Sequence, residues 1–225
     1  MEIKLLSKLS RDYVEQLLSG IPFFKLVKQQ DSWQFELLLQ SSRIVTYLPG
    51  EIVLQRGDSD QWLFFLLKGR LAVYVDDPLT GELINYVTPG EVFGDLAQLM
   101  GQPRTATVLA EANCRESIVL ATDASIFGDI RSTRPITIQT KLAYYRNTVH
   151  NLRWKLEVYR SQHLQHLLAN KHRQVKLYTG EKETIEELHA LYEQAQALAG
   201  LLLEWNREFG ALSEELASPQ TVYNL

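Results

Sequence analysis

Turn-forming residue pairs divide the middle of the chain into short apolar segments. Pro49-Gly50 and Pro89-Gly90 are two of these pairs, and such breaks recur about every 8 to 12 residues. Short strands at this spacing form a small antiparallel barrel or jelly roll, whereas a parallel sheet needs helices between its strands. No helical period fits between these turns, so the sequence predicts an all-β domain over residues 43–135.

The segments on either side of this domain have the apolar spacing of helices. Apolar residues from Ile3 to Leu18 recur at helical intervals, which predicts a helical preface within residues 1–42. After the β domain, two long helical patterns occupy about 136–177 and 184–217. The predicted fold class is therefore α+β, in which an antiparallel β-barrel carries N-terminal helices and a C-terminal helical region, residues 136–225.

Composition argues against several classes of protein. The net charge of −4 gives no general attraction to a polyanion, and the single cysteine excludes an internal disulfide, as a reducing cytosol permits. Charges interrupt the N-terminal apolar residues before a signal peptide or membrane span can form. No set of residues has metal-ligand spacing, and no nucleophile has a base within one motif. We therefore expect a cytoplasmic, non-enzymatic binding protein without a metal or cofactor.

The glycines of the predicted barrel carry a family resemblance. Gly50, Gly57 and Gly69 stand where tight turns demand a positive φ, and Ile21-Pro22-Phe23-Phe24 precedes them. Over roughly residues 20–150 the chain resembles the cyclic-nucleotide-binding domain of the catabolite-activator (CRP/FNR-like) family of bacterial regulators. The resemblance implies a cyclic-nucleotide-binding barrel of the double-stranded β-helix or jelly-roll type.

A cassette further along supplies the expected phosphate site. It consists of Phe93-Gly94-Asp95-Leu96-Ala97 and Pro103-Arg104-Thr105-Ala106-Thr107. A glycine leading from a strand into a short helix exposes backbone N–H groups to an anion, and the arginine guanidinium matches phosphate oxygens. The predicted ligand-binding residues are Gly94, Asp95, Leu96, Ala97, Arg104 and Thr105.

The ligand itself stays open at this point. The resembled family has a glutamate after the cassette glycine to accept from the ribose hydroxyl, and Asp95 is one methylene shorter. This difference weakens the sugar contact and makes a cyclic dinucleotide such as c-di-GMP a candidate beside a cyclic mononucleotide such as cAMP. The alternative interpretation is that Arg104 is a surface arginine and Asp95 a helix cap.

The first C-terminal helix has a heptad pattern running from Leu142 through Leu152 and Leu156. In the resembled family this helix forms the dimer interface and closes over the ligand, which implies a homodimer through residues 136–177. The other interpretation is that the pattern packs within its own chain. Five residues of this helix are candidate contacts to a base or to a second anion: Arg146, Thr148, His150, Asn151 and Arg153.

The second helix replaces the DNA-reading module that catabolite activators have. Thr184 and Glu187 match a helix-capping box, and an apolar three-four pattern follows them. Its glutamates would repel phosphates, so direct DNA binding is not expected. They could instead pair with the arginines of the first helix. The sequence thus predicts a messenger receptor that signals to a protein partner such as a transcription regulator; the alternatives are a ligand-free scaffold and, less favoured, a DNA-binding regulator.

Overall fold

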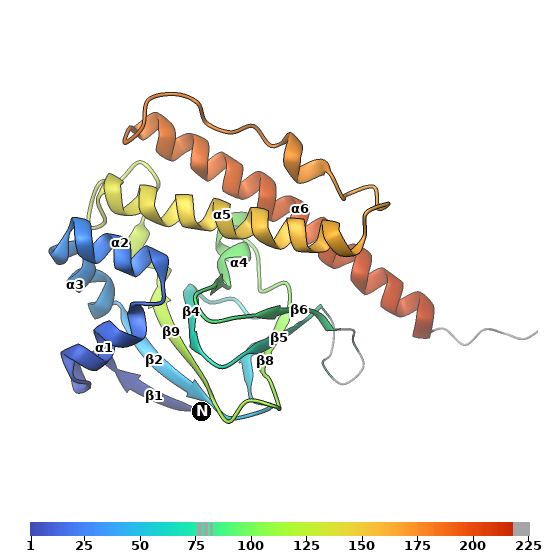
Figure 1. Cartoon of the computed structure of the whole chain (residues 1–225), viewed down its shortest axis with the longest axis horizontal. Coiled ribbons are helices and arrows are strands. Elements are labelled where there is room, and N and C mark those ends of the chain that lie inside the picture. Colours follow the sequence, from blue (N-terminus) through green and yellow to red (C-terminus); the bar gives the residue numbers. More distant parts are fainter. Residues whose placement is uncertain (76–77, 79–80, 82, 218–225) are drawn as a thin grey trace, which may run out of the picture.

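The computed structural model describes residues 1–75, 78, 81 and 83–217, without the side chains of 209–217, and places helices around a two-sheet barrel (Figure 1). Its helices are α1 (Arg11–Leu18), α2 (Pro22–Gln30), α3 (Ser32–Gln40), α4 (Asp95–Met100), α5 (Ile138–Gln162) and α6 (Ile185–Ala217). Its strands are β1 (Glu2–Leu5), β2 (Ser42–Tyr47), β3 (Ile52–Leu54), β4 (Trp62–Lys68), β5 (Leu71–Tyr74), β6 (Leu83–Val87), β7 (Val92–Phe93), β8 (Thr107–Ala110) and β9 (Ser117–Asp123).

The strands pair antiparallel in two sheets, which confirms the predicted fold class. One sheet has the order β1-β2-β9-β4-β7, and the other has the order β3-β8-β5-β6. Strand β4 is apolar along almost its whole length because both of its faces are buried. Phe64 and Leu66 pack inside the barrel, while Leu63 and Phe65 pack under the N-terminal helices.

The barrel glycines adopt the backbone conformation expected of them. Gly50, Gly57 and Gly69 have φ values of 79°, 88° and 91°. At Gly69 an added Cβ would lie 2.6 Å from the Ser117 hydroxyl and 2.7 Å from the Glu116 carbonyl. This turn therefore requires glycine for its φ and for the close approach of the neighbouring chain.

Two expectations about the flanking segments are wrong in part. The predicted N-terminal helix begins instead with strand β1, since residues 2–5 pair with the edge strand β2, from Glu2 opposite Thr46 to Leu5 opposite Arg43. Pairing along this edge prevails over the helical spacing. The helix predicted to reach residue 177 ends at Gln162.

The chain turns back after α5 and runs alongside it to the start of α6 (Figure 1). His163 and His166 lie beyond the end of α5, and both rings lie against Trp205 of α6, at 5.8 and 4.4 Å between centroids. His172 contacts Glu157 of α5 at 3.0 Å. These contacts hold the returning segment, and no proline or glycine in the sequence marks the helix end.

Helices α5 and α6 pack against each other and bury the predicted heptad pattern inside one chain. Leu142, Leu152 and Leu156 of α5 join Leu188 and Leu198 of α6 in a single apolar cluster, and all are fully buried. The expected capping box at the start of α6 is present, because Glu187 N–H donates to the Thr184 hydroxyl at 3.1 Å. Within the described part of the chain, no helix is long and apolar enough to cross a membrane.

Candidate functional site

The cassette begins at Gly94, between β7 and α4. Its φ is 81°, and an added Cβ would lie 2.8 Å from Nη1 of Arg104. Glycine is needed here because an L side chain would be strained and would also displace the guanidinium. Gly94 therefore brings the start of α4 directly against Arg104, ten residues further along the chain.

Arg104 is buried, with only 4% of its surface exposed, and its guanidinium is held from three directions. Nε donates to Asp60 Oδ2 at 3.1 Å, and Nη2 donates to Asp60 Oδ1 and to the Trp62 carbonyl. Nη1 donates to the carbonyl of Gly94. The bidentate pair with Asp60 fixes the plane of the guanidinium at one wall of the cassette.

Asp60 is a site residue that the sequence interpretation missed. Burial acts to raise the pKa of Asp60, but hydrogen bonds from the Arg104 guanidinium and the Trp62 N–H outweigh it and hold the pKa below its ordinary value. The carboxylate is thus ionised and neutralises the buried guanidinium. The signal was available in the sequence, because a buried arginine requires a carboxylate, and Asp58 and Asp60 stand in the turn before β4.

The six predicted cassette residues all line one small cavity of about 80 Å³: Gly94, Asp95, Leu96, Ala97, Arg104 and Thr105. Asp95 is 1% exposed, and its Oδ2 has no hydrogen-bond partner among the described residues. A buried acceptor without a donor is costly, so this oxygen is suited to a donor group of a ligand. The cavity thus places a guanidinium and an unpartnered carboxylate oxygen in one lining.

The opposite wall of the cavity comes from the C-terminal helices. Lys155 and Tyr159 of α5 and Leu202 and Asn206 of α6 complete the lining. Burial raises the pKa of Tyr159 above its ordinary value, so its hydroxyl stays neutral. None of these four residues was predicted, since heptad spacing identifies a buried face without identifying what that face covers.

The predicted contacts on α5 are not brought to this cavity: Arg146, Thr148, His150, Asn151 and Arg153 are all absent from its lining. Thr148 is buried and His150 is exposed. Arg153 donates to the carbonyls of His172 and Val175, at 3.1 and 3.0 Å. The α5 residues that reach the cassette, Lys155 and Tyr159, lie further along the helix.

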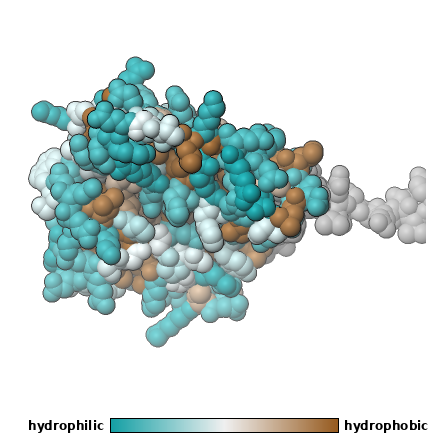
Figure 2. Space-filling view, turned by 45° about the horizontal axis from the view of Figure 1, so that its top comes forward, coloured by the Kyte–Doolittle hydropathy of each residue, from teal (hydrophilic) through white to brown (hydrophobic). Residues whose placement is uncertain are grey.

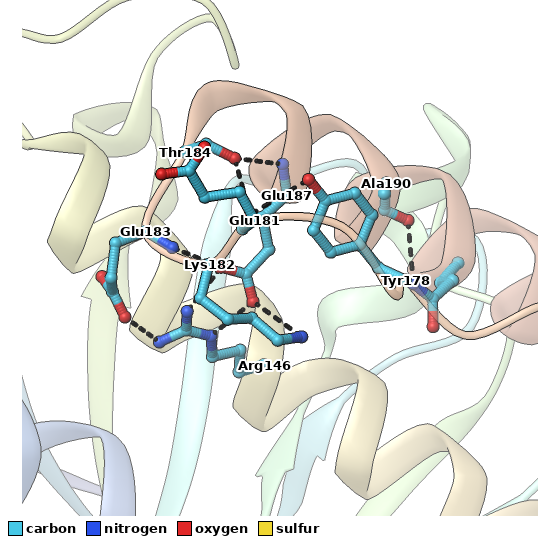
Figure 3. Close-up of polar contacts among 9 residues, drawn as sticks. Arg146, Tyr178, Glu181, Lys182, Glu183, Thr184, Glu187 and Ala190 are labelled. Atoms are coloured by element: carbon cyan, nitrogen blue, oxygen red, sulfur yellow. Dashed lines mark hydrogen bonds and ion pairs between the residues drawn. The ribbon is translucent and has the colours of Figure 1, made fainter.

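Arg146 pairs with the start of α6 instead (Figure 3). Its guanidinium donates to Glu187 at 2.6 and 3.0 Å and to Glu183 at 2.8 Å. Lys182 lies 3.7 Å from the same Glu187 carboxylate, which is almost fully buried. The arginines of α5 thus serve as partners for α6 acids and linker carbonyls, and this engagement leaves no second anion site at Arg146.

A larger groove of about 650 Å³ lies beside α4; it shares Ala97 and Pro103 with the cassette and also includes Asp60. Three tyrosines line it, Tyr144, Tyr145 and Tyr192, together with the carboxylates of Asp60 and Asp129. Its described lining includes no lysine, arginine or histidine. Because a phosphate needs cationic donors, the smaller cavity at Arg104 is the candidate anion site despite its size.

Comparison with known proteins identifies the barrel segment. Residues 44–132 match the family described as "Cyclic nucleotide-binding domain". A cGMP-dependent protein kinase of Plasmodium berghei is 32% identical over 78 residues, which are 35% of this chain and 9% of the kinase. The type II regulatory subunit of a cAMP-dependent protein kinase of Drosophila melanogaster is 28% identical over 100 residues, 44% of this chain and 26% of that protein.

The chain is also similar to solved structures. The N-terminal domain of a transcriptional regulator from Streptomyces coelicolor has 25% identity and a TM-score of 0.44, over 61% of this chain and 93% of that one. The sequence matches span about a quarter or less of the length of the curated relatives named above. Residues 44–132 of this chain are therefore a member of the cyclic nucleotide-binding domain family.

Proposed function

We propose that this chain is a non-catalytic receptor for a cyclic nucleotide, which binds at the Arg104 cassette. The observation that carries the proposal is the cavity in which the Arg104 guanidinium and the unpartnered Oδ2 of Asp95 share one lining. A cyclic phosphate would accept from the remaining N–H of Arg104 and from nearby backbone groups, and a ribose hydroxyl would donate to Asp95.

A cyclic mononucleotide is favoured over a cyclic dinucleotide. The dinucleotide hypothesis depended on a second group of arginines along α5, and Arg146 and Arg153 are engaged with α6 and the linker. One guanidinium at the cassette matches one phosphate. The kinase relatives are named for cGMP and cAMP, and this agrees with a mononucleotide here.

The readout we propose is contact with another protein, such as a transcription regulator. Direct DNA binding is disfavoured because the described acids of α6, including Glu204 and Glu208, would face any phosphate near that helix. A homodimer through residues 136–177 stays a prediction. It would use the exposed face of α5, which carries Trp154, because the apolar face packs on α6.

A ligand-free scaffold is the second candidate, and the size of the cavity favours it. At about 80 Å³ the cavity is below the roughly 300 Å³ at which ligand pockets begin. Arg104 also has protein partners for most of its N–H groups. If this interpretation holds, the barrel serves only to position the helices.

Calorimetric titration of the full chain with cAMP, cGMP, c-di-GMP and c-di-AMP separates the two candidates. We expect one cyclic mononucleotide to bind, and Arg104→Lys to weaken it by about 10- to 100-fold because lysine cannot form the bidentate contact. Arg115→Lys, on an exposed arginine of the same barrel, is the matched control and should bind normally. No heat with any of the four ligands would leave the scaffold as the function.

A further inference from the structure

Helix α6 forms one wall of the nucleotide cavity. Leu202 and Asn206 line the cavity from one face of α6 and are only 4% and 6% exposed. Trp205, between them in sequence, is buried against the Tyr159 ring at 5.9 Å between centroids. This part of α6 is therefore packed onto the barrel side of α5 and directly over the cassette.

The remaining walls have little freedom to move. Val73, Asn85 and Val108 belong to strands of one hydrogen-bonded sheet, and Gly94 is tied to Arg104. The α5 part of the lining is tied to the barrel as well, because Lys155 donates to the Val92 carbonyl at 3.1 Å. Helix α6, in contrast, takes no part in strand pairing: within the described part of the chain it is held by side-chain contacts and by the segment 163–184 that leads into it. Enlarging the cavity to the size of a nucleotide therefore requires α6 to shift.

The attachments of α6 differ along its length. Its start is held by the ion pairs of Arg146 with Glu183 and Glu187 (Figure 3), and its middle by Gln196, which donates to the Leu99 carbonyl at 3.2 Å. At the cavity, Oδ1 of Asn206 is buried and has no hydrogen-bond partner among the described residues. The same turn is held from outside by Glu204, which accepts from Lys171 at 3.2 Å, and by Trp205 against the rings of His163 and His166, but its Asn206 oxygen is left unsatisfied.

We propose that the turn of α6 from Leu202 to Asn206 is an internal plug of the nucleotide site. It occupies the space that a ligand's base needs, and ligand binding displaces it. This inference rests on the proposed receptor function and adds the means by which that site is regulated.

If α6 is a plug, substitutions that loosen it change the ligand affinity in one direction only. A plug reduces the apparent affinity by the fraction of molecules in which it is open, so weakening the plug must strengthen binding. If α6 were instead a lid that contacts the ligand, the same substitutions would weaken binding. The two roles therefore give opposite signs.

Titration of full-length Leu202→Ala and Asn206→Ala with cAMP and cGMP tests this sign. We expect either substitution to tighten binding by about tenfold, whereas Leu201→Ala, on the same turn but outside the cavity lining, leaves it within about twofold. Weaker binding by Asn206→Ala would overturn the plug and make Asn206 a ligand contact. Unchanged binding by both variants would also overturn it.

Hydrogen exchange measured by mass spectrometry gives an independent readout on the unmodified chain. Saturating nucleotide should speed exchange in the α6 peptides around residues 196–208, while those of β4 stay protected. Binding accompanied by slower exchange in α6 refutes the plug and leaves the receptor function standing. If neither the unmodified chain nor Leu202→Ala binds a nucleotide, the receptor function itself fails.

Discussion

Asp95 and Asp60 show two different uses of a carboxylate near Arg104, where Asp95 is buried and Asp60 is partly exposed. Asp60 is fully engaged, with both oxygens on the Arg104 guanidinium and one also accepting from the Trp62 N–H at 2.8 Å. Asp95 keeps an oxygen without a donor in almost complete burial. The first arrangement stabilises the fold, and the second is costly unless a ligand supplies the donor.

This contrast predicts opposite effects of Asp95→Ala on binding and on stability. Affinity for the cyclic nucleotide should fall by about tenfold or more, because the ribose contact is lost. The free energy of unfolding should stay the same or rise by up to about 1–3 kcal/mol, since a buried unpaired acceptor is removed. Urea denaturation alongside calorimetry measures both quantities.

Asp58→Ala is the matched control, because the Asp58 side chain is exposed in the turn before β4. It should change neither stability nor affinity appreciably. A loss of stability in Asp95→Ala with unchanged affinity would show that Asp95 is a structural residue of α4 and has no contact with the ligand.

At the scale of elements, the carboxylate of Glu157 joins Arg153 in holding the segment after α5 to that helix. Glu157 accepts from Arg160 at 2.8 Å, contacts His172 at 3.0 Å and accepts from Arg173 at 2.9 Å. The hydrogen bond from Arg160, with those from His172 and Arg173, lowers the pKa of Glu157 to about 2 against the opposing effect of burial. This carboxylate keeps the returning chain in place where no sequence pattern does so.

The lowered pKa predicts an acid-dependent contribution to stability. The folded-state pKa lies below the ordinary value of 4.5, so the contribution is complete above about pH 4.5 and is lost as the pH falls toward 2. Thermal unfolding should therefore separate Glu157→Gln from the unmodified chain at pH 6, with a gap that closes near pH 2. Because the carboxylate is partly exposed, we expect a gap of only a few degrees. A gap that is constant with pH would exclude this role.

At the scale of the whole molecule, the apolar faces of α5 and α6 close on each other and on the barrel. Figure 2 shows that the outer face over these helices is largely hydrophilic, with hydrophobic side chains only in small patches. The heptad pattern therefore acts as the core of one chain. Its burial also connects the cavity at Arg104 to the C-terminal half, because α6 contributes to both.

A core formed within one chain predicts that unfolding does not depend on protein concentration. Leu152 is fully buried between the helices, so Leu152→Ala should lower the free energy of unfolding by about 2–5 kcal/mol. The denaturation midpoint should not depend on protein concentration, as it would if the seam joined two chains. Leu167→Ala, at a side chain that is 90% exposed, is the control. A midpoint that rises with concentration would place Leu152 in a dimer interface.

The sequence by itself determined the features whose information is local. Turn spacing indicated the barrel, and its glycines indicated the turns that need a positive φ. The cassette is complete within residues 93–107, so its six residues meet in one cavity as predicted. Apolar spacing identified α5 and α6 but not the true end of α5 at Gln162.

Only the tertiary structure decided which distant side chains and elements pack against each other. Asp60 reaches Arg104 from 44 residues away, Arg146 meets Glu187 from 41 residues away, and Asn206 completes a cavity that begins at Gly94. A helical period states that a residue lies on a buried or charged face, and it contains no information on which distant element covers that face. That choice depends on how the barrel, α5 and α6 pack together, which is why the α6 wall of the cavity at Arg104 could not be read from the sequence.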